Sequence, residues 1–182
     1  MYSVELLVYD LSKGMAKMMS LALTGKQFDG IWHTSIVIHD TEFYYSQGIN
    51  AITPLSSEHG EPVKRTKMGT TAQSLADIKL LLKDLEDVFT VDAYHIINNN
   101  CNHFTDVVLK KLELKGCPDD IMSLAAEVMA TPFGAMVKPL FEKMFVGKRK
   151  EMDQEMIHNE LNSLVGKKDG DLVFETIQSA LD

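Results

Sequence analysis

Three segments near the start of the chain have the alternating or β-branched pattern of β-strands. In residues 3–10, Val4, Leu6 and Val8 recur at every second position, a period that predicts a strand. Residues 30–38 and 42–48 are rich in β-branched and aromatic side chains, which strands favour. The polar residues 39–41 suit a tight turn between them. We therefore predict an antiparallel sheet with one hairpin.

The next part of the chain changes to a helical period. Residues 54–69 contain glycine, proline and lysine, and they predict a loop with one more short strand near 62–68. From Ser74 onward apolar residues recur every three or four positions, which predicts a helix over residues 72–89. The remaining elements predicted before residue 146 are a short strand at 91–97 and helices at 103–114, from 118 onward and from 131 to about 145.

The composition changes again at residue 147. Residues 147–182 are rich in charged residues, and two narrow apolar stripes lie on either side of residues 166–170. Each stripe has helical spacing. We predict a charged, helical C-terminal extension that packs on its own domain or on a second subunit. Partner binding and partial mobility are the alternatives.

Length and charge limit the function classes. A chain of 182 residues with 45% apolar residues can fold as one ordinary globular domain. Its net charge of −8 argues against nucleic-acid binding, which needs clustered basic residues. The apolar run at residues 18–23 is too short to span a bilayer and lacks the flanks of a secretory signal. We expect no integral membrane segment.

The two cysteines, Cys101 and Cys117, are too few for a disulfide scaffold or a zinc cluster. We therefore expect a reducing intracellular compartment, no metal and no cofactor. Cys117 follows a helix-ending glycine, and nothing near it in the sequence activates a thiol. We interpret it as incidental.

Cys101 has a different setting, because an asparagine-rich turn meets a predicted helix there. A free thiol has a pKa of about 8.5 and is mostly unreactive at neutral pH. A helix N-terminus favours the thiolate, and an imidazole such as that of His33 can activate the thiol and protonate a leaving group. Asn100 or Asn102 could help to stabilise an oxyanion or support the site. Sequence spacing alone does not show that His33 and Cys101 meet.

Five short segments, taken in order, resemble the PPPDE superfamily of the desumoylating isopeptidase (DeSI) type. They are Val-Tyr-Asp-Leu-Ser at 8–12, Gly-Ile-Trp-His-Thr-Ser-Ile at 30–36, Glu-Phe-Tyr-Tyr at 42–45, Asn-Cys-Asn-His-Phe at 100–104, and residues 123–132. The resemblance implies an α+β fold of circularly permuted papain-like type, with a small antiparallel sheet packed with helices. It also implies a PPPDE-type peptidase domain over residues 1–146.

The resemblance further implies a Cys–His dyad, with Cys101 as nucleophile and His33 as general base and acid. The expected reaction removes a ubiquitin-like modifier, SUMO or ubiquitin, from a lysine of a target protein. The expected state is a homodimer in the cytoplasm and also in the nucleus. Protein S-acyl thioester hydrolysis by the same dyad and a non-catalytic adaptor role are the alternatives. Family members commonly have histidine where this chain has Asn99, and the extension has no counterpart in the family.

Other candidate residues have less specific settings. Trp32, next to His33, either lines a substrate groove or packs in the core, because neighbours on a strand point to opposite faces. His39 and His59 lie in polar loops, and we predict that both are solvated. His103 lies two residues after Cys101 on a helix, where the two side chains diverge.

Overall fold

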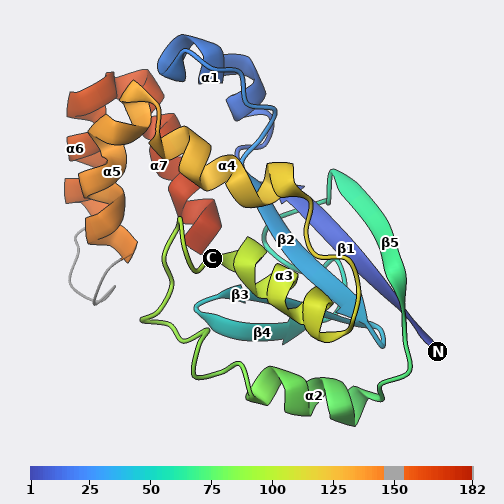
Figure 1. Cartoon of the computed structure of the whole chain (residues 1–182). Coiled ribbons are helices and arrows are strands. Elements are labelled where there is room, and N and C mark those ends of the chain that lie inside the picture. The colour runs from blue at the N-terminus through green and yellow to red at the C-terminus, as the bar shows by residue number, and fades with distance from the viewer. Residues whose placement is uncertain (146–153, 182) are drawn as a thin grey trace.

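The computed structural model describes residues 1–145 and 154–181, whose arrangement is shown in Figure 1. A five-stranded sheet forms the centre, and every neighbouring pair is antiparallel, in the order β4-β3-β2-β1-β5. Its strands are β1 (Tyr2–Asp10), β2 (Trp32–Ile38), β3 (Thr41–Ser46), β4 (Gly48–Ile52) and β5 (Lys64–Thr71). The predicted antiparallel sheet is confirmed.

The β2–β3 hairpin has the predicted turn. His39 and Asp40 both adopt positive φ angles, 51° and 53°, and a two-residue hairpin turn of this kind matches the twist of its strands. The prediction of one strand over 42–48 is wrong at its end. Gly48, at φ 94°, allows the chain to reverse again. A fourth strand, β4, therefore pairs with β3.

Helices cover the sheet and extend beyond it. They are α1 (Met15–Thr24), α2 (Leu75–Lys83), α3 (Cys101–Lys111), α4 (Asp119–Met129), α5 (Pro132–Phe145), α6 (Gln154–Val165) and α7 (Lys167–Leu181). The sequence did not predict α1, because its apolar residues do not form one buried stripe. Met18 and Leu21 are exposed and Ser20 is buried.

Two predicted elements differ from the structure. The helix predicted over 72–89 ends at Lys83, and Leu85 then donates to the Leu82 carbonyl in a tighter i to i+3 turn. The strand predicted at 91–97 is wrong, since the chain there forms turns with one isolated bridge, His95 to Asn99. The Asn99 side chain donates to the carbonyls of Val88 and Ala93, and these bonds hold the segment as a compact loop.

The three central strands, β1, β2 and β3, are largely buried on both faces. On one face α3 packs against β2 and β3, and the apolar core lies between them, with Ile36 from β2, Tyr45 from β3 and Phe104 from α3. The other face is covered by the loop that joins β4 to β5. The ring of His59 in this loop packs against the rings of Tyr9, His33 and Tyr44. The predicted α+β class is confirmed, and the circularly permuted papain-like order stays a prediction.

The described part of the C-terminal extension forms two helices. α6 and α7 pack against each other, and Gly166, at φ 85°, lies at the sharp turn between them. Leu161 of α6 is fully buried, and Val173 and Phe174 of α7 pack against the core. In Figure 1 the two helices lie with α4 and α5 on one side of the molecule. The two helices therefore pack on their own chain.

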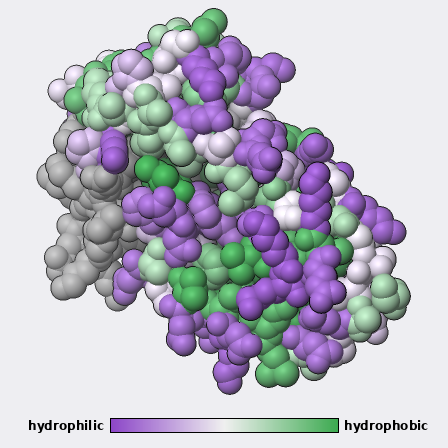
Figure 2. Space-filling view, in the orientation of Figure 1, coloured by the Kyte–Doolittle hydropathy of each residue, from purple (hydrophilic) through white to green (hydrophobic). Residues whose placement is uncertain are grey.

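The apolar surface and the length of the helices can be compared with the expectation of no membrane-spanning segment. Figure 2 shows apolar side chains over α2 and α3 with hydrophilic ones around them. Within the described residues no single helix has the length and apolar character needed to cross a bilayer. The helix α4 and residues 132–139 of α5 meet that test only as a pair, and the pair is bent by 75°.

Candidate active site around Cys101

The start of α3 is fixed by Asn100. Its side-chain oxygen accepts hydrogen bonds from the backbone N–H groups of Asn102 (2.9 Å) and His103 (3.2 Å), and the His103 side chain bonds back to Asn100 in a capping box. Such a cap satisfies N–H groups that the first helical turn leaves free. The helix consequently begins at Cys101, two residues earlier than predicted, and this position puts the thiol in its first turn.

Cys101 is almost fully enclosed. Its side chain is 4% exposed, and the thiol donates a hydrogen bond of 3.6 Å to the side-chain oxygen of Asn102. Burial raises the pKa of the Cys101 thiol to about 11, and interactions with the Thr34 backbone and the Tyr94 hydroxyl offset this only in part. Desolvation therefore outweighs the helix N-terminus here, and the resting thiol is protonated at neutral pH.

Asn102 joins α3 to β2. Its amide nitrogen donates to the Trp32 carbonyl at 3.1 Å, and its oxygen accepts from the Thr34 hydroxyl at 2.9 Å. The amide nitrogen of Asn100 likewise donates to the Ile96 carbonyl at 2.6 Å. Each amide nitrogen uses one of its two N–H groups in this way, and these bonds tie the start of α3 to β2 and to the segment before the helix.

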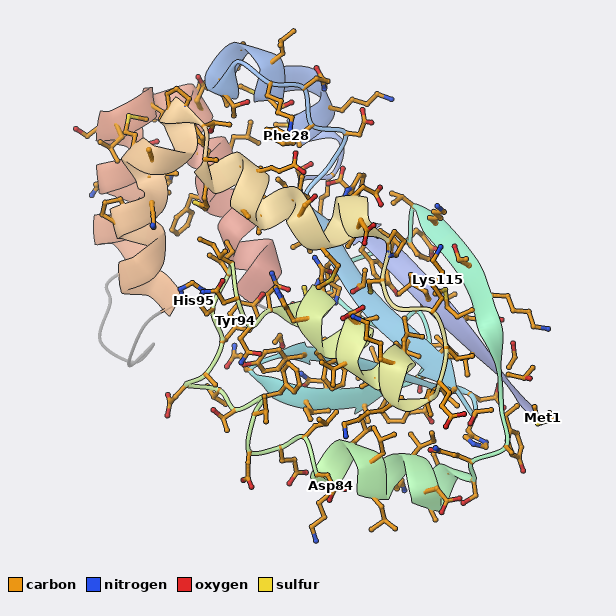
Figure 3. All side chains as sticks on the ribbon, viewed as in Figure 1. Met1, Phe28, Asp84, Tyr94, His95 and Lys115 are labelled. Carbon is orange, nitrogen blue, oxygen red and sulfur yellow. The ribbon has the colours of Figure 1, made fainter. Side chains whose placement is uncertain are left out.

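A cavity of about 180 Å³ opens beside Cys101. Trp32, Asn100 and Asn102 line it together with the thiol, so the structure brings four of the five predicted site residues to one cavity. Phe28, near α1, and Tyr94, on the segment before α3, also line it and are labelled in Figure 3. The remaining wall is mostly apolar and comes from α1, α4, α5 and α7. Trp32 thus lines the cavity and also packs against the core.

His33 lies on the other face of β2. The neighbouring Thr34 points toward α3, where its hydroxyl bonds Asn102, and successive side chains of a strand point to opposite faces. The His33 ring lies 4.0 Å from that of His59 and 5.5 Å from that of Tyr44, measured between centroids. Among the described residues no hydrogen bond joins His33 to Cys101, and Nε2 of His33 has no hydrogen-bond partner.

The surroundings of His33 keep it neutral. Burial, and then the nearby His59, hold the pKa of the His33 imidazole well below its usual value. A neutral imidazole can accept a proton, which is the property that a general base needs. The structure thus places a proton acceptor on β2, the strand beside Cys101, but on the face away from the thiol, so the two groups are not in contact.

Sequence reasoning missed the polar cluster on this second face. His59, predicted to be solvated, is 5% exposed because its ring packs among those of Tyr9, His33 and Tyr44. The fully buried Glu42 carboxylate accepts hydrogen bonds from the hydroxyls of Tyr9 (2.8 Å) and Ser35 (2.6 Å) and from the backbone N–H of Leu55 (2.8 Å). One signal in the sequence could have indicated this second face. Glu42 and the apolar Phe43 are neighbours on one strand, and neighbouring side chains of a strand point to opposite faces.

The described part of the chain contains no metal centre, and the second cysteine, Cys117, is not activated. No group of three or more histidine, cysteine, aspartate or glutamate side chains there could hold a metal ion. Cys117 is buried, and its pKa is raised to about 12 by that burial and by Asp106. A thiol in this setting is unreactive at neutral pH.

Comparisons with known proteins agree on one family. The chain matches the PPPDE peptidase domain over residues 2–142. It is 39% identical over 146 residues to desumoylating isopeptidase 1 of Rattus norvegicus, covering 79% of this chain and 87% of that protein. The values for desumoylating isopeptidase 1 of Homo sapiens are the same. The chain is also 34% identical over 114 residues to a desumoylating isopeptidase 1 homolog of Caenorhabditis elegans, and this match covers 57% of this chain and 34% of that protein.

Proposed function

Because the chain belongs to the PPPDE peptidase family, we propose that it is a cysteine isopeptidase that removes a ubiquitin-like modifier from lysine side chains of target proteins. The similarity to desumoylating isopeptidases over 79% of the chain carries this proposal. It favours SUMO as the modifier and SUMO-conjugated proteins as the substrates. The family match over residues 2–142 includes both His33 and Cys101.

The chemistry that we propose has two steps. The Cys101 sulfur attacks the carbonyl of the modifier's C-terminal glycine and gives its proton to His33. His33 then protonates the lysine amine as the isopeptide bond breaks, which leaves a thioester between the modifier and Cys101. Water adds to this thioester with His33 as base, and the products are the free modifier and the regenerated thiol.

This mechanism requires His33 to approach Cys101, because the two side chains lie on opposite faces of β2. A turn of the ring alone cannot carry it across the sheet, so the backbone at the start of β2 must also rearrange. Nε2 of His33 has no hydrogen-bond partner among the described residues that would oppose this movement. Cys101 must also lose the enclosure that raises its pKa. We therefore propose that substrate binding moves both groups into contact.

The decisive test compares wild type with Cys101→Ala and His33→Ala. Each purified protein is treated with SUMO or ubiquitin that carries an electrophile at its C-terminus. The fraction of protein that forms a covalent adduct is measured by mass spectrometry. We expect Cys101-dependent labelling by one modifier, and little labelling of the His33 variant. His39→Ala serves as the control, because its ring contacts the Gln73 carbonyl and does not line the cavity beside Cys101. Equal behaviour of wild type and all variants would support the non-catalytic adaptor instead.

A second candidate function has one observation in its favour. The cavity beside Cys101 has a mostly apolar wall, which suits a hydrocarbon chain. Hydrolysis of a protein S-acyl thioester would use the same thiol, with an easier leaving group. Turnover of a fluorogenic acyl thioester that depends on Cys101, without labelling by any modifier, would favour this candidate.

The assembly and location proposed for the protein follow from the same resemblance. We propose a homodimer in the cytoplasm and also in the nucleus, without a nucleic-acid partner or a cofactor. Mass in solution by light scattering tests the dimer, and fluorescence imaging of the tagged full chain tests the location.

A further inference from the structure

We propose that the C-terminal hairpin of α6 and α7 covers Cys101 and controls which substrates reach it. The nature of those substrates rests on the proposed function. The cover itself rests on the positions of the described side chains, and its test needs no assumption about the reaction.

The first observation is that α7 forms part of the wall around the thiol. Leu172, Val173 and Thr176 of α7 line the same cavity as Cys101. Glu175, between these positions, is exposed to solvent. The helix therefore turns its apolar face to the cavity and its charged face to water, as a docked amphipathic helix does.

The second observation is that the hairpin is held together as one unit. His158 of α6 lies 2.5 Å from a carboxylate oxygen of Asp171 on α7, and its ring stacks on Phe174 with centroids 4.5 Å apart. Asn162 of α6 donates to the same carboxylate at 3.2 Å. These contacts connect α6 to α7, whereas Leu161, Val173 and Phe174 connect the hairpin to the core.

The third observation is that the hairpin lies outside the part of the chain that matches the peptidase family. The match to the peptidase family ends at residue 142, whereas α6 begins at residue 154. The segment that holds Cys101 and the segment that covers it are therefore separate parts of the sequence. The hairpin is held on the peptidase domain by contacts between apolar side chains, and such contacts can open without breaking a covalent bond.

The consequence is steric. A thiol that is 4% exposed is shielded from a reagent as large as the C-terminal tail of a ubiquitin-like protein. When α7 leaves the cavity, one wall beside Cys101 is removed and an extended chain can approach the sulfur. A substrate or partner that competes for the apolar groove would thereby open the site.

The experiment uses the full chain with Val173→Asp, which places a charge in the apolar contact. The matched control is Leu164→Asp, the same kind of change at a position of α6 that is 39% exposed. Iodoacetamide alkylation of Cys101 and Cys117 is followed separately by peptide mass spectrometry. Hydrogen exchange of residues 167–176 reports whether α7 has undocked, and exchange of β2 reports whether the domain remains folded.

The expected result is that Val173→Asp increases exchange in α7 and accelerates alkylation of Cys101 about tenfold or more. Cys117 and the Leu164→Asp control should stay close to wild type. Undocking of α7 without faster alkylation of Cys101 would overturn the proposal. Retention of α7 even in a Leu172→Asp, Val173→Asp double variant would also overturn it, since α7 would then be a fixed wall.

The same variants separate this inference from the proposed function. Modifier probes and acyl thioesters are applied to each of them after the alkylation test. Faster alkylation of Cys101 without reaction with any substrate would support the cover and contradict the isopeptidase. Substrate reaction that is equally fast in wild type and Val173→Asp would support catalysis and contradict the cover.

Discussion

Replacement of Asn100 by alanine tests the link between the α3 cap and the reactive thiol. The side chain accepts two backbone N–H bonds, from Asn102 and His103, and donates one to the Ile96 carbonyl. Loss of an N-cap costs about 1 kcal/mol, and loss of one further hydrogen bond costs about 1 kcal/mol. We expect the free energy of unfolding to fall by about 2 kcal/mol, which lowers the Tm by about 4–8 °C in a domain of this size.

The control is Ser74→Ala, because Ser74 caps α2 in a capping box with Asp77 and has no place in the Cys101 cavity lining. It should cost about 1 kcal/mol. Urea unfolding followed by circular dichroism measures both variants, and iodoacetamide measures the reactivity of Cys101. We expect faster alkylation in Asn100→Ala alone, since the first turn of α3 frays there. Equal alkylation in the two variants would refute the link.

Three further predictions concern burial. Tyr9→Phe removes one of the donors to the buried Glu42 carboxylate and should cost about 1.5–3 kcal/mol in urea unfolding, whereas Tyr2→Phe, at an exposed tyrosine, should cost almost nothing. Leu161→Ala, at a fully buried site of α6, should cost about 2–5 kcal/mol, and a loss like that of Leu164→Ala would contradict its packing role. Because burial raises the Cys101 pKa from 9.0 to about 11, alkylation should rise about tenfold per pH unit beyond pH 9, and a plateau near pH 9 would contradict the shift. The same shift should lower stability above pH 9, because the thiol of the unfolded chain ionises first.

Local patterns were sufficient to predict most of the elements near the site. The alternation in β1 and the turn at His39 and Asp40 depend on neighbours in sequence, and both are confirmed. The α1 helix was missed because most of its residues are apolar, so no single stripe at helical spacing marks a buried face. The false strand at 91–97 arose because an apolar run does not show that the Asn99 side chain will bond the backbone of its own loop.

The site itself could be predicted only in part. Local sequence placed Cys101 where a turn meets a helix, and the helix begins at Cys101 itself, two residues before its predicted start. The direction in which the His33 side chain points depends on which face of β2 packs against α3. Tertiary packing determines this, and the spacing of residues in the sequence does not reveal it. The burial of His59 likewise depends on a loop that folds across the sheet, and its polar neighbours in sequence suggested the opposite.

Burial of Cys101 imposes two barriers that have one physical cause. The surrounding protein excludes large reagents from the sulfur, and it also disfavours the thiolate by removing water. Opening the cavity would lower both barriers together, because water that enters stabilises the charged form while the approach becomes free. The helix N-terminus and a neighbouring imidazole could then favour the thiolate without the opposing cost of desolvation. Access and reactivity are thus coupled at this thiol, and a mutation that improves one should improve the other.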